Sequence, residues 1–328
     1  MIGTGGSGKS TFCKQMQILH DQQQTLDAAL HKSILLSNII IGLQERIHVA
    51  NKNDIETSEE NRKIARHMLE LNPWDIQWTD KLLGSAKKLY EDKFITELTK
   101  IPDVQLQIPE MEYLMARIDD FYNPEYVPSA SDILRARQRT TGNHSVSFCT
   151  AKHKWTLIDL GGQFSEREKW VNILGATENL DNVKSKPPFA FIAFIALDDY
   201  DVKSVEDPAK TKFVLSLEVI AQFARNPEAA NLCPLLFLNK NDIFKTKIAS
   251  EKGFASFKAN FPDFQGEQTY DDTFLHIKTI TAEYFQREAN LAEVPIFGTC
   301  ALDAELMSKV FEEAQGYMFK RLLSYYGL

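Results

Sequence analysis

A glycine-rich segment near the start of the chain carries the residue types of a phosphate-binding loop. It reads Gly3-Thr4-Gly5-Gly6-Ser7-Gly8-Lys9-Ser10-Thr11. The glycines allow a tight turn whose backbone N–H groups meet phosphate oxygens, where side chains would collide. The Lys9 ammonium would neutralise the β and γ phosphates, and the Ser10 hydroxyl would bind Mg²⁺. A flexible linker would explain adjacent glycines but not this register. The predicted phosphate site comprises Gly5, Gly6, Ser7, Gly8, Lys9, Ser10 and Thr11.

A later segment predicts which purine is bound. An apolar run, 233–238, leads into Asn239-Lys240-Asn241-Asp242. The Asp242 carboxylate can accept hydrogen bonds from guanine N1–H and the 2-amino group, which adenine cannot supply. An unpaired buried carboxylate is costly, so we expect Asp242 to be buried and to select guanine. We expect Lys240 to lie over the base and Asn239 to brace both the base and the loop.

A second strand end supports the same base. The apolar run 294–297 leads into Thr299-Cys300-Ala301, and the backbone N–H of Ala301 could meet guanine O6. A polar turn would explain either segment alone, but two such ends beside one another favour a base pocket. Cys300 and Ala301 are therefore predicted to contact the nucleotide.

The residues for hydrolysis are expected in a third strand and the turn after it. The run Trp155–Leu160 delivers Asp159, which would hold Mg²⁺ through water. Beyond it, the Gly162 N–H can meet the γ phosphate, and Gln163 can orient an attacking water. An ordinary strand-to-turn junction with an incidental aspartate is the alternative for this segment taken alone.

The preceding segment, 132–142, is rich in arginine. We predict Thr140 as a second Mg²⁺ ligand and Arg137 as a cation that stabilises charge in the transition state. A run of arginines is also typical of a solvated surface. On these residues alone, both interpretations of Arg137 stay open.

The order and spacing of these five motifs resemble those of heterotrimeric G protein α subunits, and the resemblance covers nearly the whole chain. Ser165–Trp170 is similar to the family's second switch helix. The resemblance implies a Ras-like GTPase domain with an inserted helical domain, GDP or GTP and Mg²⁺ as ligands, and slow GTP hydrolysis. It also implies that Leu134 and Arg135 touch the ribose and base in a cleft between the domains.

The same resemblance implies partners and a location. They are a Gβγ dimer, a seven-helix receptor at the C-terminal tail, an RGS-type regulator and a downstream effector, at the cytoplasmic face of the plasma membrane. In the family, a lipidated N-terminal helix binds βγ and makes the protein membrane-peripheral. Because Met1-Ile2 directly precede the loop, we expect this helix and most of a first strand to be missing, the natural protein to be longer and the given chain to be cytosolic.

Several positions depart from the family pattern. Gly6 stands where an acidic residue is common, and Phe164 replaces a basic residue after the glutamine. Leu215 occupies the position of the usual acidic partner of Arg167, although Glu218 lies one turn on, so we do not count on ion pairing to order the switch. An insertion is expected at 179–188. These departures leave open a scaffold that holds GDP with little turnover. A small monomeric GTPase, the other alternative, would lack the helical insert and the arginine in cis.

Composition excludes several other classes. The net charge of −8 argues against a nucleic-acid binder, whose surface would be basic. The seven histidines lack metal-ligand spacing, and no apolar run has the ~18 residues of a membrane span. Wide spacing of the cysteines favours reduced thiols over disulfides; they are Cys13, Cys149, Cys233 and Cys300.

The pattern of apolar residues predicts one domain interrupted by another. Residues 25–135 show helical periodicity without strand-like alternation, which predicts an all-α domain. Residues 1–24 and 136–328 alternate apolar strands with helices, which predicts an α/β domain with a doubly wound, mostly parallel sheet. Ligands of such sheets bind at the carboxyl ends of the strands, where the motifs lie. The expected strands are 144–149, 154–160, 189–197, 232–238 and 294–299.

Overall fold

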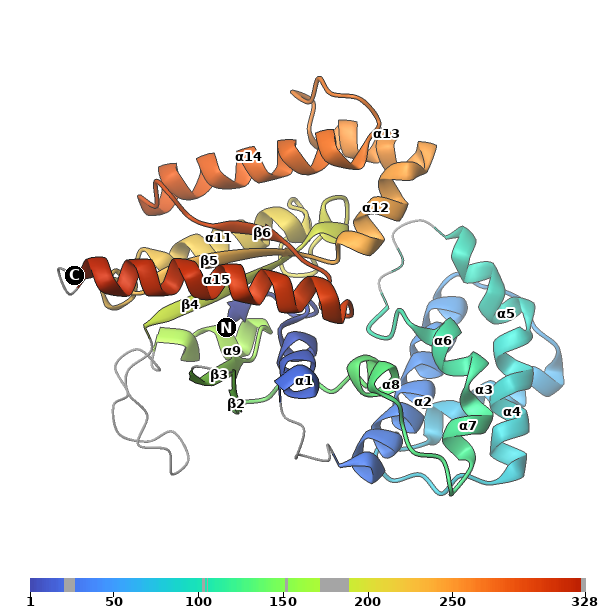
Figure 1. Ribbon diagram of the computed structural model, residues 1–328. Helices are drawn as coiled ribbons and strands as arrows, with labels where there is room; N and C mark the ends of the chain where they lie inside the picture. Colours follow the sequence, from blue (N-terminus) through green and yellow to red (C-terminus); the bar gives the residue numbers. More distant parts are fainter. Residues whose placement is uncertain (21–26, 102–103, 105, 151–152, 172–188, 326–328) are drawn as a thin grey trace. The chain divides into compact units, whose positions relative to one another are not determined.

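The computed structural model describes residues 1–20, 27–101, 104, 106–150, 153–171 and 189–325 (Figure 1). By its internal contacts the chain divides into two compact units. We call Met1–Gln22 with Arg139–Leu328 the sheet unit and Gln23–Gln138 the helical unit. The predicted insertion at 179–188 and most of the tail lie outside the described residues.

A four-stranded parallel sheet forms the centre of the sheet unit, in the order β1-β4-β5-β6. Its apolar strands are buried on both faces, as expected for a parallel sheet covered by helices. All seven residues of β5 are buried, and Ala193 of β4 pairs with Leu236 of β5. The predicted parallel sheet is thus confirmed. The strands are β1 (Ile2–Gly3), β4 (Ala190–Ala196), β5 (Cys233–Asn239) and β6 (Ile296–Gly298).

Two further predicted strands are present but pair differently. β2 (Asn143–Cys149) and β3 (Lys154–Leu160) form a separate two-stranded antiparallel sheet in the described part of the chain. The expectation of one continuous sheet is therefore corrected. The physical reason is that β2 and β3 pair with each other along all seven residues of each strand. Toward the parallel sheet, Met1, next to β1, donates from its amino nitrogen to Ile158 O of β3 at 2.6 Å.

Helices cover both faces of the parallel sheet (Figure 1). On one face, Phe12 of α1 packs with Phe194, Phe237 and Phe311, the last from α15. On the other face, helices α11 and α14 pack on the strands through a second cluster that includes Ile220. The helices with described bounds are α1 (Lys9–His20), α9 (Phe164–Arg167), α11 (Lys212–Ala224), α12 (Asn241–Ala249), α13 (Glu251–Asn260), α14 (Tyr270–Ala289) and α15 (Ala304–Tyr325), with 3₁₀ turns η2 (Leu197–Asp199) and η3 (Pro227–Ala229).

The helical unit packs short helices around one long helix, α2, and contains no strand among its described residues. Leu35, Ile39, Leu43 and Ile47 recur at helical spacing on α2 and are completely buried in an apolar core. Some of the shorter helices begin at capping residues, among them Ser58 and Thr79. The elements are α2 (Ala28–Lys52), α3 (Glu59–Glu70), α4 (Asp80–Glu91), α5 (Lys93–Thr96), η1 (Glu97–Lys100), α6 (Met111–Ala116), α7 (Ile118–Tyr122) and α8 (Ala130–Arg135).

Among the described residues, no helix combines the length and the apolar character that crossing a bilayer requires.

Candidate functional site

The loop between β1 and α1 has a backbone that requires glycine. Gly6 and Gly8 have φ angles of 81° and 103°, in the left-handed region that other residues rarely adopt. The turn is closed by a hydrogen bond from Ser7 N to Thr4 O at 3.3 Å. At Gly8 there is also no room, because an added Cβ would lie 2.0 Å from Asn239 Nδ2.

Lys9 follows this loop as the first residue of α1, and its side chain folds back into the loop. Its Nζ donates to Gly3 O at 2.8 Å and to Thr4 O at 3.0 Å. The residue is only 5% exposed. Burial lowers the pKa of Lys9 to about 8. A buried cation held by neutral carbonyls is a strong site for an anion, because phosphate oxygens would supply the missing opposite charge.

Three oxygen-bearing side chains meet beside Lys9, from α1, from the segment before β2 and from the end of β3. Ser10 Oγ donates to Asp159 Oδ2 at 2.5 Å and lies 2.8 Å from Thr140 Oγ1. Asp159 is 3% exposed, and its Oδ1 has no hydrogen-bond partner in the described part of the chain. Hard oxygen ligands with one unsatisfied carboxylate oxygen suit Mg²⁺. The donor set therefore fits the predicted metal. The described residues contain no cluster of three His, Cys, Asp or Glu ligands.

The turn after β3 lies directly against the phosphate-binding loop. A Cβ added at Gly162 would lie 2.4 Å from Gly3 O and 2.6 Å from Lys9 Nζ. Gln163 is exposed, and a Cβ added at Gly5 would lie 2.5 Å from its Nε2. The structure therefore brings the Gly162 backbone and the Gln163 amide next to the loop.

An ion pair anchors the segment after this turn, contrary to expectation. Arg167 forms a bidentate pair with Glu206, both N–O distances being 2.7 Å, and its Nε donates to Gly162 O at 3.0 Å. The nearby Glu218 pairs instead with Lys210 at 2.8 Å. Sequence reasoning looked for the acidic partner of Arg167 at the position of Leu215, on α11. It missed Glu206 because this residue comes from the loop before α11.

The loop that carries Glu206 is itself ordered by hydrogen bonds. Ser204 N donates to Lys210 O at 2.9 Å, and Glu206 N donates to Ser204 Oγ at 3.1 Å. No sequence motif marks this arrangement, because it depends on how the loop folds back.

At the other end of the site, the Asn239 amide joins three segments. Its Nδ2 donates to Ser7 O at 2.8 Å, and its Oδ1 accepts from Thr299 Oγ1 and from Ala301 N, each at 3.1 Å. Asn239 is 2% exposed. The Ala301 N–H that we predict for guanine O6 thus has Asn239 as its acceptor here. A base that used this N–H would share it with the amide.

The two charged residues of the predicted base motif lie at the start of α12. Lys240 has a φ of 63°, and its Nζ donates to Asp198 Oδ2 at 2.9 Å. Asp242 is exposed, which corrects the expectation of a buried carboxylate. The reason is its place in the first turn of a surface helix. It does lie beside the predicted base segment: burial and the Asp242 charge together raise the pKa of Cys300 to about 11.

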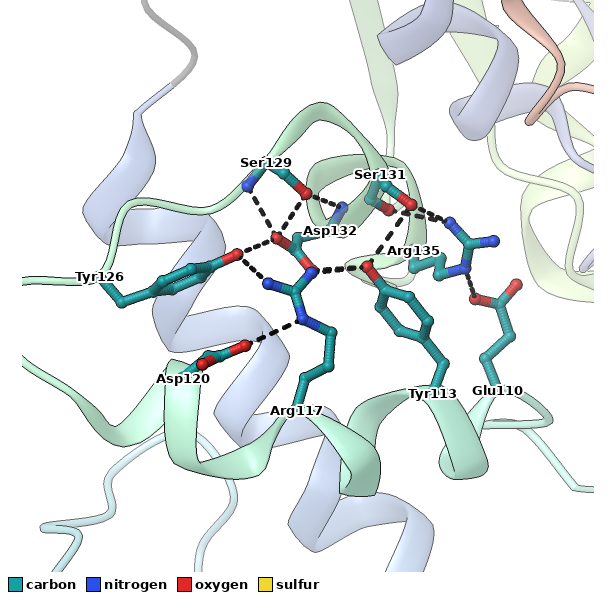
Figure 2. Close-up of polar contacts among 9 residues, drawn as sticks. All are labelled: Glu110, Tyr113, Arg117, Asp120, Tyr126, Ser129, Ser131, Asp132 and Arg135. Carbon is teal, nitrogen blue, oxygen red and sulfur yellow. Dashed lines mark hydrogen bonds and ion pairs between the residues drawn. The ribbon is translucent and has the colours of Figure 1, made fainter.

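The remaining predicted residues belong to the helical unit. Leu134 and Arg135 end helix α8, and the exposed Arg137 follows it. Leu134 is 8% exposed. Arg135 Nε lies 3.1 Å from Glu110 Oε2, and its guanidinium lies 4.4 Å from the centre of the Tyr113 ring (Figure 2). Its Nη1 also donates to Ser131 Oγ, so three side chains of its own unit contact Arg135.

Helix α8 is fixed by Asp132, which is completely buried (Figure 2). Its carboxylate accepts from Arg117 Nη1 at 2.6 Å, Tyr113 OH at 2.7 Å and Tyr126 OH at 2.5 Å. It also accepts from Ser129 N at 2.7 Å, closing a capping box. Burial alone would raise the pKa of Asp132, but hydrogen bonds from Tyr126, Ser129 and Tyr113 hold it below its ordinary value. The spacing Ser129-x-x-Asp132 could have revealed the cap, although not the three partners from outside the helix.

Known proteins similar to this chain were found by comparison. A family model described as G-protein alpha subunit matches residues 1–318. The chain is 29% identical to the guanine nucleotide-binding protein alpha-9 subunit of Dictyostelium discoideum, over 98% of this chain and 89% of that protein. It is 28% identical to the alpha-16 subunit of Caenorhabditis briggsae, over 100% of this chain and 90% of that protein. The alpha-4 subunit of Dictyostelium discoideum is also 28% identical, with coverage of 99% and 90%.

Proposed function

Because the chain belongs to the G-protein alpha subunit family, we propose that it is a guanine-nucleotide-dependent molecular switch that binds GDP or GTP and hydrolyses GTP slowly. The observation that carries the proposal is the buried Lys9 ammonium, enclosed by the glycine-rich loop and beside the cluster of Ser10, Thr140 and Asp159. The phosphate oxygens of a nucleoside triphosphate would place negative charge next to the Lys9 ammonium, which here is hydrogen-bonded to neutral carbonyls. Phosphate oxygens would also meet the loop N–H groups at the start of α1.

Mg²⁺ would be held by Ser10 and Thr140 directly and by Asp159 through water. The unpartnered Oδ1 of Asp159 supports this assignment, since a buried carboxylate oxygen otherwise lacks any compensation for its desolvation. When bound, the ion would neutralise charge on the β and γ phosphates. The Ser10 hydroxyl, which donates to Asp159, would turn its oxygen to the ion when the metal binds.

Guanine selection would rest on Asp242, with Lys240 over the base and Cys300 and Ala301 at its edge. The proximity of Asp242 to Cys300 and the bonds of Asn239 to both Ser7 and Ala301 support a base site here. Asp242 is exposed, and the bound base itself would bury its carboxylate. The N1–H and 2-amino groups of guanine would then donate to this carboxylate, whereas a purine without these donors would leave it buried and unpaired.

Hydrolysis would proceed by positioning and electrostatics, with little chemistry done by the protein itself. Gln163 would place the attacking water, and the Gly162 N–H and Lys9 would bind the γ phosphate. Arg137 would meet the charge that develops in the transition state. The tight approach of Gly162 to Gly3 and Lys9 supports a γ-phosphate contact at this position.

The switch itself would consist of the segments that carry Thr140 and Gly162, which lose their γ-phosphate contacts on hydrolysis. We propose the family's partners for these surfaces: a Gβγ dimer, a seven-helix receptor at the C-terminal tail, an RGS-type regulator and a downstream effector. We also propose peripheral attachment to the cytoplasmic face of the plasma membrane. The anchoring of Arg167 by Glu206 supports a segment built to be ordered.

A scaffold that holds GDP with little turnover is the second candidate. Gly6 and Phe164, where the family has charged residues, favour it. One experiment separates the two: phosphate release over many turnovers is compared with the decay of pre-bound GTP, in the wild type and in Gln163→Leu. A switch releases phosphate at the rate of GDP exchange, and its bound GTP decays much more slowly in Gln163→Leu. A scaffold keeps GTP intact in both proteins, which would refute hydrolysis.

A further inference from the structure

A polar side chain lies in the middle of the apolar face of α2. Asn38 is completely buried, and it is flanked along the helix by the core residues Leu35 and Ile39. Burying an amide in such surroundings is unfavourable unless its donor and acceptor are both hydrogen-bonded. The hydrogen-bond partners of the Asn38 amide therefore indicate which segment this residue positions.

Both bonds of Asn38 go to the backbone of a single residue, Arg137. Asn38 Oδ1 accepts from Arg137 N at 2.7 Å, and Asn38 Nδ2 donates to Arg137 O at 2.7 Å. One side chain thus satisfies both main-chain groups of Arg137, much as a neighbouring β-strand would. The amide fixes the position and the orientation of this backbone, while the Arg137 side chain is exposed.

The chain just before Arg137 is also held firmly. Ala136 is 2% exposed, and its N donates to Asp132 O at 2.8 Å, which closes the last turn of α8. Helix α8 in turn is anchored by the buried Asp132 carboxylate (Figure 2). Arg137 therefore leaves the helical unit's core from a point that is fixed both through α8 and through α2.

We propose that Asn38 is a positioning residue for GTP hydrolysis, which acts by fixing the backbone from which the Arg137 guanidinium reaches the transferring phosphoryl group. This inference rests on the proposed function, and in particular on the role of Arg137. An arginine side chain has many rotamers, so a fixed backbone limits where its charge can lie. Misplacing a catalytic group by about 1 Å can lower a rate by about 100-fold.

The test compares single-turnover hydrolysis of pre-bound GTP in Asn38→Ala, Arg137→Ala and the double variant. Asn38→Ala is expected to lower the rate by about 10- to 100-fold. The double variant is expected to hydrolyse GTP at the rate of Arg137→Ala alone, within about twofold, because Asn38 acts only through Arg137. Binding of a slowly hydrolysed GTP analogue is measured in each protein to establish that each has folded.

Gln44→Ala provides the matched control. Gln44 lies on the same helix, and its Nε2 also donates to two backbone carbonyls, Met68 O and Leu71 O, each at 2.9 Å. The Gln44→Ala variant therefore removes a side-chain amide that also bonds to the backbone, and it leaves the bonds between Asn38 and Arg137 intact. Its hydrolysis rate is expected to stay within about twofold of the wild type.

Each other result overturns the proposal in a distinct way. If Asn38→Ala hydrolyses GTP at the wild-type rate while Arg137→Ala is slow, the positioning role of Asn38 is refuted and the catalytic role of Arg137 stands. A further drop from Arg137→Ala to the double variant also refutes the positioning role, since a general structural defect would act in both backgrounds. An unchanged rate in Arg137→Ala refutes the catalytic role of Arg137 and the inference with it.

Discussion

The buried ammonium of Lys9 costs folding free energy unless an anion compensates its charge. Within the described part of the chain, its hydrogen-bond partners are a hydroxyl and two neutral carbonyls of its own loop. Residue types and spacing singled out Lys9, Ser10 and Asp159, which the structure brings together, and their roles as phosphate and metal ligands stay a prediction. Glu206 and Asn38 could not be predicted, since their partners depend on folds of distant segments.

The lowered pKa of Lys9 predicts a pH dependence of stability. Burial brings this pKa to about 8 in the folded chain, against 10.5 as its ordinary value. Between these pH values the unfolded chain binds more protons, so Lys9 makes the unfolding free energy rise with pH. The full gain is on the order of 3 kcal/mol.

This prediction is checked by denaturant unfolding of the nucleotide-free protein from pH 7 to 10, with Lys9→Met as the reference. At pH 7 the variant should be the more stable protein, and the difference should shrink as pH rises through 8. Curves that stay parallel over this range would mean that Lys9 is not desolvated.

Among the elements, strands were more predictable than their pairing. Each expected strand is present with ends shifted by at most two residues, because apolar runs of strand length end at motif residues. Their division into two sheets could not be predicted, since apolar runs mark where strands lie but not which strands pair. Helical periodicity within 25–135 did not reveal the break between α6 and α7 at Arg117, whose guanidinium binds Asp132 and whose backbone leaves the helical region.

The anchoring of α9 by Glu206 yields a second prediction. Trp170, in the same segment, is 2% exposed and donates to Gly161 O at 2.8 Å, so its fluorescence reports the order of this region. Glu206→Gln removes the charge opposite Arg167 and should reduce the fluorescence change on binding a GTP analogue with Mg²⁺. The variant is expected to lose about 1 kcal/mol of the free energy that stabilises the ordered segment. This loss shifts the equilibrium between the ordered and the relaxed segment several-fold toward the relaxed one.

Glu218→Gln is the control for this measurement, because Glu218 pairs with Lys210, whereas Arg167 pairs with Glu206. It should give the wild-type fluorescence change. Equal effects of the two variants would show that general loss of negative charge, rather than the Arg167 pair, is responsible.

The molecule as a whole contains separate apolar cores for its two units. The units change at 22/23 and 138/139, close to the limits at 24/25 and 135/136 that periodicity predicts.

Separate cores predict separate responses to core mutations. Leu43→Ala on α2 removes a completely buried side chain from the helical core and should cost about 2–5 kcal/mol. Hydrogen exchange should therefore accelerate in α2 to α8 and stay unchanged in β4 and β5. Leu236→Ala, in the core of the sheet unit, should give the opposite pattern. Acceleration throughout the chain in both variants would contradict independent cores.

The central proposal is that the loop around Lys9 binds a nucleotide whose base is selected by Asp242. Competition against a fluorescent GTP analogue, with Mg²⁺ present, tests it most directly. GTP and GDP should displace the analogue, ATP should require at least about 100-fold more, and Asp242→Asn should shift the preference toward xanthine nucleotides. Displacement by ATP as readily as by GTP, or no binding of the analogue at all, would contradict the account.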